Sequence, residues 1–152
     1  MSWYDDNIYI YVFIIILIDF IIKLFIKNNF IVNESIEVIN NFFYITYCKN
    51  YGVAWSMFSG KQIIPIIVAI IVLIYIFFEI KRSKKLDKFD IIGYSLLTGG
   101  IIGNLIDRIF YGYVIDYLDF YIFNYNYPVF NFADICIVIG VIIIIFFKKG
   151  DK

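Results

Sequence analysis

Four long apolar segments dominate the pattern of hydrophobic and polar positions along the chain. They cover residues 8–26, 63–80, 91–111 and 129–147, and polar residues gather between them. Each is close to the ~20 residues that a helix needs to cross a hydrocarbon core of about 30 Å. The first is longer than the apolar core of a secretory signal and follows acidic residues, so it is predicted to be a retained helix. The pattern predicts four transmembrane helices in one membrane-embedded domain, residues 1–152.

The segment between the first two spans, residues 27–62, has a different character. Ser35 to Tyr47 reads SIEVINNFFYITY, which is rich in β-branched and aromatic residues, and the turn-prone Asn50 and Gly52 follow. This composition predicts short strands, which we expect to lie on the outer membrane surface. Such a platform could hold an extended peptide, or it could be a packed cap with no role in substrate binding.

Basic residues are distributed unevenly between the loops. The sequence KRSKKLDK lies between the second and third spans and KKGDK follows the fourth, whereas residues 113–128 contain no basic residue. Because Lys and Arg concentrate in cytoplasmic loops, both basic segments are predicted to be cytoplasmic. Both termini are then cytoplasmic, and residues 27–62 and 112–128 lie on the outer side.

The composition agrees with a chain that lies mostly in lipid, and it excludes several classes of enzyme. Hydrophobic residues make up 62% of the chain and charged residues 17%, and a net charge of zero gives no general attraction to nucleic acid. The chain has no histidine, which excludes serine–histidine triads, cysteine–histidine dyads and the zinc-binding HExxH motif. A hydrolase would have to use carboxylates or a serine–lysine pair. Cys48 and Cys136 lack metal-type spacing, and no disulfide is expected between them.

Ionisable side chains inside the predicted spans each need a partner or a function, because inserting one costs ~3 kcal/mol. Asp19 and Lys23 lie on one helical face of the first span and are predicted to form an ion pair that fixes helix packing. Near the outer end of the third span, Asn104, Asp107 and Arg108 follow several glycines that let helices approach closely. Asp107 and Arg108 could form an interfacial pair, or Arg108 could bind substrate.

Two further acids converge on the outer surface by independent routes. Asp134 lies just inside the fourth span, and Asp116 lies in the loop that leads to it from the third span. Because the third span ends and the fourth begins at the outer surface, both acids should reach the same depth. This convergence predicts a carboxylate dyad, with Asp119 as a rival to Asp116 that the spacing does not exclude.

Two neighbouring carboxyl groups in a partly dehydrated site share one proton, so that one acts as base and the other as acid. Such a pair can hydrolyse a peptide bond without a metal or an organic cofactor. Buried acids also suit a small proton- or cation-coupled carrier, although the inverted repeat and broken spans of carriers are not seen in the sequence. A serine–lysine peptidase built on Lys23 with Ser56 or Ser95 is a further alternative, but Asp19 would keep the Lys23 amine charged.

Six motifs occur in order along nearly the whole chain: DFIIK (19–23), EVINNFFYIT (37–46), KNYGVAWS (49–56), GGIIGNLIDR (99–108), GYVIDY (112–117) and FNFAD (130–134). Together they resemble the motifs of the lipoprotein signal peptidases, also called signal peptidase II. Two positions depart from that family: residues 20–22 are apolar where it usually has polar residues, and residues 50–54 read NYGVA where it usually reads NxGAA. These departures bear on packing and substrate preference and leave both acids in place. The GxGD motif of prepilin- and presenilin-like aspartyl proteases is absent from the sequence.

The resemblance implies a fold, a reaction and a set of site residues. The fold is four transmembrane helices with a small extracytoplasmic β-cradle, and the protein is a multi-pass aspartyl endopeptidase of the bacterial cell membrane. The implied reaction removes the signal peptide of prolipoproteins by cleavage before the diacylglyceryl-modified cysteine. Implied partners are lipid-modified prolipoprotein signal peptides, membrane lipid and globomycin-type peptide inhibitors, with no cofactor and no metal. By this resemblance the catalytic pair is Asp116 and Asp134, the site-supporting or substrate-binding residues are Asn50, Gly52, Asn104, Arg108 and Asn131, and the structural pair is Asp19 and Lys23.

Overall fold

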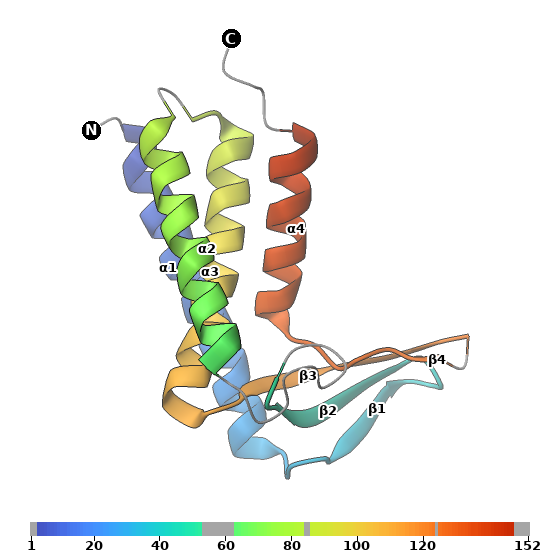
Figure 1. The fold of residues 1–152 in the computed structure, drawn as a ribbon. Coiled ribbons are helices and arrows are strands. Elements are labelled where there is room, and N and C mark those ends of the chain that lie inside the picture. Colours follow the sequence, from blue (N-terminus) through green and yellow to red (C-terminus); the bar gives the residue numbers. More distant parts are fainter. Residues whose placement is uncertain (1–2, 53–62, 84–85, 124, 148–152) are drawn as a thin grey trace.

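The computed structural model describes residues 3–52, 63–83, 86–123 and 125–147. Within these residues, four helices stand side by side and a small sheet projects from one end of the bundle (Figure 1). Their order is α1 (Trp3–Asn29), β1 (Ser35–Ile39), β2 (Phe43–Asn50), α2 (Ile63–Arg82), α3 (Lys88–Tyr111), β3 (Val114–Ile122), β4 (Tyr125–Asn126) and α4 (Phe132–Phe147).

The predicted spans are recovered as helices, with one correction. Among the described helices, α2, α3 and the part of α1 from Asn7 to Asn29 are long and apolar enough to cross a membrane. α4 is apolar but has only 16 residues. It begins at Phe132 and not at residue 129 as predicted, because Asn131 caps the helix and Phe130 pairs with Leu118 of β3.

α3 lies at the centre of the bundle and packs against α1, α2 and α4. A Cβ atom on Gly100 would lie 2.4 Å from the carbonyl oxygen of Ala133, and one on Gly140 of α4 would lie 2.7 Å from the backbone nitrogen of Leu97. Glycine therefore permits this close approach of two helix backbones, which confirms the packing role predicted for glycines of the third span. The outer faces of the helices expose apolar side chains, for example Phe78 at 63%.

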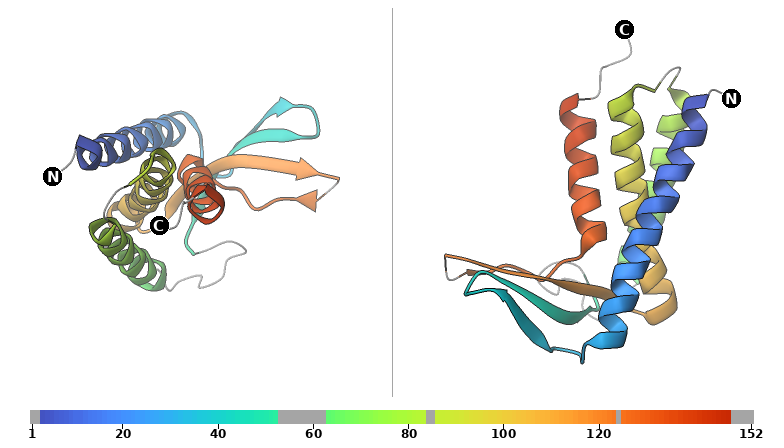
Figure 2. Two further views of the ribbon diagram at one scale, coloured as in Figure 1. Left: turned by 90° about the horizontal axis from the view of Figure 1, so that it is seen from above. Right: turned by 180° about the vertical axis from the view of Figure 1, so that it is seen from behind.

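The sheet has the order β1-β2-β3-β4, and neighbouring strands are antiparallel. The strands predicted from residue 35 onward are confirmed by β1 and β2. The prediction that residues 112–128 form only a loop is wrong, because β3 and β4 lie there. β3 is stabilised as a strand because β2 supplies its backbone partners, and the pairing puts Cys48 opposite Asp116. The sheet extends sideways beyond the helices (Figures 1 and 2).

β3 carries two acids, and they lie on different faces of the sheet. Residues alternate between the faces of a strand, so Asp116 shares one face of β3 with the apolar Leu118 and Phe120. This face is turned toward α4, whose capping asparagine donates a hydrogen bond to Asp116. The other face carries Asp119, which accepts a hydrogen bond from the Thr46 hydroxyl. β3 therefore presents its two acids in opposite directions.

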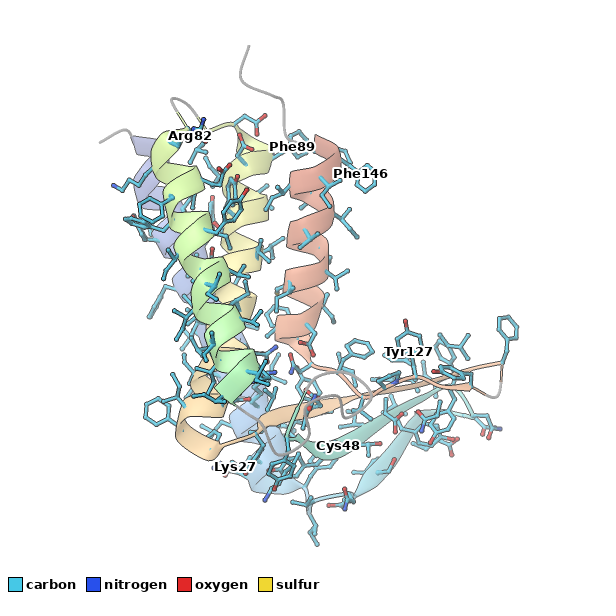
Figure 3. All side chains as sticks on the ribbon, in the orientation of Figure 1. Lys27, Cys48, Arg82, Phe89, Tyr127 and Phe146 are labelled. Atoms are coloured by element: carbon cyan, nitrogen blue, oxygen red, sulfur yellow. The ribbon has the colours of Figure 1, made fainter. Side chains whose placement is uncertain are left out.

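The ends of the bundle also differ. α1 begins and α4 ends on the side away from the sheet (Figure 2), and Arg82 and Phe89 mark the same side in Figure 3. The opposite ends of α1, α3 and α4 meet the sheet. Polar side chains are buried near this junction, namely Asp19, Lys23, Asn104, Asp107, Asp116 and Asn131.

Candidate active site

Asp116 and Asp134 line one cavity at the junction of the helices and the sheet. Asp116 comes from β3 and Asp134 from the first turn of α4. The cavity has a volume of about 520 Å³, and Asn50 and Arg108 also line it. The convergence predicted for the two acids is therefore present: strand and helix bring them to the same site.

The start of α4 has a capping box built from Asn131 and Asp134. The Asn131 Oδ1 atom accepts a hydrogen bond of 3.0 Å from the backbone N–H of Asp134, and Asp134 Oδ2 accepts one of 3.1 Å from the backbone N–H of Asn131. A side chain that satisfies the free N–H groups of a first turn defines where a helix begins. The sequence NFAD thus fixes both the start of α4 and the position of Asp134.

The same asparagine connects the two acids. The Asn131 Nδ2 atom donates to Asp116 Oδ1 at 2.7 Å, and the Asn50 side chain of β2 donates to Asp116 Oδ2 at 2.8 Å. Burial raises the pKa of Asp116 to about 7, and the negative charge of Asp134 adds to the increase, while the two asparagine hydrogen bonds oppose it. Asp116 is therefore able to hold a proton near neutral pH.

Asn104 of α3 connects Asp134 to the first helix. Its Nδ2 atom donates to Asp134 Oδ1 at 2.7 Å, and its Oδ1 atom accepts a hydrogen bond of 2.9 Å from Lys23 Nζ. The predicted pair of Asp19 and Lys23 is confirmed, with 2.7 Å between Lys23 Nζ and Asp19 Oδ2. Lys23 also contacts Asp107 at 3.1 Å, so three acceptors surround one ammonium group.

Arg108 lies on the cavity wall and not in a pair with Asp107. Its guanidinium donates to the carbonyl oxygen of Asn104 at 3.2 Å and to that of Gly52 at 3.4 Å. Among the described residues, the ion pair of Asp107 is with Lys23. Of the two alternatives left open for Arg108, the interfacial pair with Asp107 is therefore not formed. The Asn50 Oδ1 atom accepts a hydrogen bond of 3.0 Å from the backbone N–H of Gly52, two residues later. This bond keeps the turn beside the site.

The cavity has a polar end at the two acids and an apolar end along α4. Ile135, Val138 and Ile139 form the apolar side, together with residues 127–130 that precede the helix. Val138 is 57% exposed on the surface of α4. Tyr127 lies above the sheet, to one side of the lower end of α4, in Figure 3. The site is therefore shaped to receive a group with both polar and apolar parts.

Several residues near the acids were not singled out from the sequence. Tyr117 accepts the backbone N–H of Phe132 at 3.2 Å and so supports the start of α4. Cys48 is a free thiol directly across the strand pair from Asp116, and burial raises its pKa. These residues could not be singled out because β3 was not predicted. Only when VIDYLDFYI is known to pair with β2 as a strand does its alternation show which side chains share a face with Asp116. Ser56, named in the serine–lysine alternative, lies outside the described residues.

Comparisons with known proteins agree along most of the chain. Residues 11–148 match the family described as signal peptidase (SPase) II. A protein named lipoprotein signal peptidase, from Wigglesworthia glossinidia brevipalpis, is 44% identical over 139 residues, which are 89% of this chain and 89% of that protein.

Two solved structures share the fold, both titled as a bacterial membrane enzyme structure obtained by the in meso method. The one at 2.3 Å resolution has a TM-score of 0.85 and 34% identity, and it covers 97% of this chain and 94% of its own. The one at 1.9 Å resolution has a TM-score of 0.84 and 35% identity, with 97% and 95% covered.

Proposed function

Because the chain belongs to the signal peptidase II family, we propose that Asp116 and Asp134 are its catalytic pair. The protein is a multi-pass membrane protease that acts on prolipoproteins. The aspartic mechanism is our proposal. The observation that carries it is the meeting of the buried Asp116 and the half-buried Asp134 at one cavity, joined through Asn131. The cleavage site we propose is the bond before the diacylglyceryl-modified cysteine.

The proposed reaction uses one shared proton. Asp134, ionised, takes a proton from a water molecule whose oxygen attacks the peptide carbonyl carbon. Asp116, protonated, donates a hydrogen bond to the carbonyl oxygen as negative charge develops there. When the carbon–nitrogen bond breaks, a proton passes to the leaving nitrogen, and the pair again holds one proton.

The surroundings of the two acids support this division of roles. The raised pKa of Asp116, about 7, favours its protonated form near neutral pH. Asp134 is in the first turn of α4, where the partial positive charge of a helix N-terminus stabilises a negative charge. Arg108 and Asn50 line the same cavity, and we propose that they orient the substrate backbone.

The cavity also suggests how lipid-modified partners bind. We infer that the apolar side formed by Ile135, Val138 and Ile139 receives the acyl chains of the precursor or of a membrane lipid. Globomycin-type peptide inhibitors would occupy the same space. Residues 1–152 would act as a single membrane-embedded peptidase domain.

The proposed orientation puts both termini in the cytoplasm and the sheet outside. The basic Lys81 and Arg82 end α2 on the side away from the sheet, which agrees with the positive-inside rule. A cysteine introduced at Ser83 should resist membrane-impermeant thiol reagents in intact cells, whereas one at Asn126 should react. The reverse labelling would overturn the orientation.

Neither alternative function has comparable support. Membership of a protease family disfavours a proton- or cation-coupled carrier. The Lys23 Nζ atom contacts two carboxylates, at 2.7 and 3.1 Å, and donates to Asn104. Ser95 Oγ has no hydrogen-bond partner among the described residues, so Ser95 and Lys23 do not form the pair that a serine–lysine peptidase needs.

The proposed function is tested by mapping the cut. Purified protein is incubated with a lipid-modified precursor, and the product masses are measured. We expect cleavage directly before the modified cysteine, and none with folded Asp134→Asn or with a precursor that lacks the lipid. A folded Asp134→Asn protein that produces the same cut at the parent rate would contradict the proposal.

A further inference from the structure

A second buried polar cluster lies between α1 and α3, next to the proposed catalytic pair. It consists of Asp19, Lys23 and Asp107, with exposed fractions of 1%, 2% and 3%. The Lys23 Nζ atom lies 2.7 Å from Asp19 Oδ2 and 3.1 Å from Asp107 Oδ2. We call these three residues the ionic hub.

Each carboxylate of the ionic hub also holds the backbone beside one catalytic aspartate. Asp19 Oδ1 accepts a hydrogen bond of 3.2 Å from the backbone N–H of Ala133, the residue directly before the aspartate of α4. Asp107 Oδ2 accepts one of 3.1 Å from the backbone N–H of Ile115, the residue directly before the aspartate of β3. The same arrangement therefore occurs twice, on two different elements.

The hub also reaches one catalytic carboxylate through a side chain. Lys23 Nζ donates to Asn104 Oδ1 at 2.9 Å, and Asn104 Nδ2 donates to Asp134 Oδ1 at 2.7 Å. An ammonium group has three N–H donors, and Lys23 has three acceptors, two carboxylates and one amide. The ammonium is therefore held in one position, and its acceptors lead to both catalytic acids.

We propose that Lys23 is a positioning residue whose ammonium group fixes the separation and orientation of the two catalytic carboxylates through Asp19, Asp107 and Asn104. This inference rests on the proposed function of Asp116 and Asp134. Lys23 acts on the reaction through these three side chains. A displacement of about 1 Å at a catalytic group can cost on the order of 10²-fold in rate, so the hub should influence turnover more than substrate binding.

Helix packing alone does not explain these contacts. An ion pair that fastens α1 to α3 needs only Lys23 and Asp107, whereas the hub also binds the backbone of α4 and of β3. The fold leaves space for it: a Cβ atom on Gly103 would lie 2.6 Å from Asp19 Oδ2. A glycine at this point lets the Asp19 carboxylate reach across α3 to the start of α4.

The hub acts on the pair through charge as well as position. Burial is the main cause that raises the pKa of Asp116, and the positive charge of Lys23 opposes the increase. Without the ammonium, the pKa of Asp116 should rise further, because the attraction that opposed the increase is lost. The charged groups that surround the site in the described chain are Asp19 and Lys23 of α1, Asp107 and Arg108 of α3, Asp116 of β3 and Asp134 of α4.

The test is kinetic. In Lys23→Met, kcat for a lipid-modified precursor should fall on the order of 10²-fold, while KM changes little because Arg108 and Asn50 still line the cavity. The alkaline limb of the pH profile, which the Asp116 proton sets, should move to higher pH. In the double variant Asp19→Asn with Lys23→Met, fewer charges are left unpaired, so folded yield should partly recover while kcat stays low.

Two glycine substitutions in α3 form a matched control pair. A Cβ atom on Gly103 meets Asp19 of the hub, whereas one on Gly99, a turn earlier, meets the Ile15 side chain at 2.7 Å. Both Gly103→Ala and Gly99→Ala crowd the contact between α1 and α3, so both should lower the melting temperature. Only Gly103→Ala should lower kcat per folded molecule and shift the alkaline limb.

The positioning role is overturned if folded Lys23→Met, or the double variant, keeps the parent kcat and an unshifted alkaline limb. It is also overturned if the two glycine variants lose kcat equally, and this comparison decides the matter if Lys23→Met does not fold. Asp116→Asn is measured alongside. Parent activity in Asp116→Asn would refute the catalytic pair itself, whereas an inactive Asp116→Asn beside a parent-like Lys23→Met would remove only the positioning role.

Discussion

Two pairs of carboxylates lie at the junction of helices and sheet, and they differ in what stands between them. Asp19 and Asp107 both contact the Lys23 ammonium, at 2.7 and 3.1 Å. Asp116 and Asp134 are joined by the side chain and backbone of one asparagine, and no described cation forms an ion pair with either of them. Asp19, Asp107 and Asp116 are buried and Asp134 is half-buried, and only the second pair lines the cavity.

This comparison indicates that the groups in contact with an acid decide what that acid can do. Asp19 and Asp107 both contact the Lys23 ammonium, and each also accepts a backbone hydrogen bond, so these carboxylates have a structural role. Asp116 and Asp134 line a cavity, and no described cation forms an ion pair with either, so we propose that they hold one proton in common. Aspartate therefore holds the structure together in the pair of Asp19 and Asp107, whereas the surroundings of Asp116 and Asp134 suit acid–base chemistry.

The largest effect should follow from removing proton exchange in the cavity pair. Asparagine keeps the shape of aspartate but cannot exchange a proton, so Asp116→Asn and Asp134→Asn should each reduce turnover about 10²- to 10⁴-fold. Because the two act as one unit, the double variant should be scarcely slower than either single variant. The measurement is the initial rate of precursor cleavage.

The matched control for this experiment is Asp119→Asn. Asp119 lies on the opposite face of β3 and accepts its hydrogen bond from Thr46, so this variant should keep substantial activity. Additive losses for Asp116 and Asp134, or a loss as large for Asp119, would contradict the assignment of the pair.

The second effect concerns stability and should separate the two pairs. Lys23→Met leaves the carboxylates of Asp19 and Asp107 buried without their cation, which should cost about 3 kcal/mol of folding free energy. Asp116→Asn should cost little, because neutralising a buried acid removes its desolvation penalty. Thermal unfolding in detergent measures the stability of both variants. Equal losses of stability in Lys23→Met and Asp116→Asn would contradict the distinction between the two pairs.

A smaller effect is expected from the asparagine that joins the cavity pair. Asn131→Ala removes the cap of α4, worth about 1 kcal/mol, and the hydrogen bond to Asp116. We expect roughly a tenfold loss of turnover for one lost contact to a catalytic group, together with a lower melting temperature. Asn126→Ala, an exposed residue of β4, is the control, and a parent-like Asn131→Ala would argue against the bridge.

The smallest effect is a shift in pH dependence. The Asn50 hydrogen bond lowers the pKa of Asp116, so Asn50→Ala should raise that pKa. The shared proton is then kept to higher pH, and the alkaline limb of the rate profile should move upward. Asn40→Ala, in the turn after β1, should leave the limb in place. A shift of the alkaline limb to lower pH in Asn50→Ala would contradict the expected rise of the Asp116 pKa.

Much of this fold follows from hydrophobic patterning, because a lipid solvent permits few alternatives. Three predicted spans became helices of membrane-spanning length, and the strands predicted from Ser35 onward became β1 and β2. The pair of Asp19 and Lys23 follows from helical spacing alone. These features depend on local sequence, so one chain is sufficient to predict them.

The remaining features depend on long-range contacts. β3 could not be predicted because a strand needs its partner, and β2 lies more than sixty residues earlier in the chain. Asp107 pairs with Lys23 of another helix and not with its neighbour Arg108, because the side chain of each points to a different side of α3. The start of α4 could have been predicted from the capping box in FNFAD, which overrides the apolar run before it.

The most direct test of the central claim is an infrared titration of the carboxyl groups in purified protein. The account predicts a protonated carboxyl signal near pH 6 that disappears as the pH rises through about 7, the pKa of Asp116. This signal should be absent from Asp116→Asn and present in Asp119→Asn. A titration in which parent and Asp116→Asn give the same carboxyl signals at every pH would contradict the claim that this pair shares a proton.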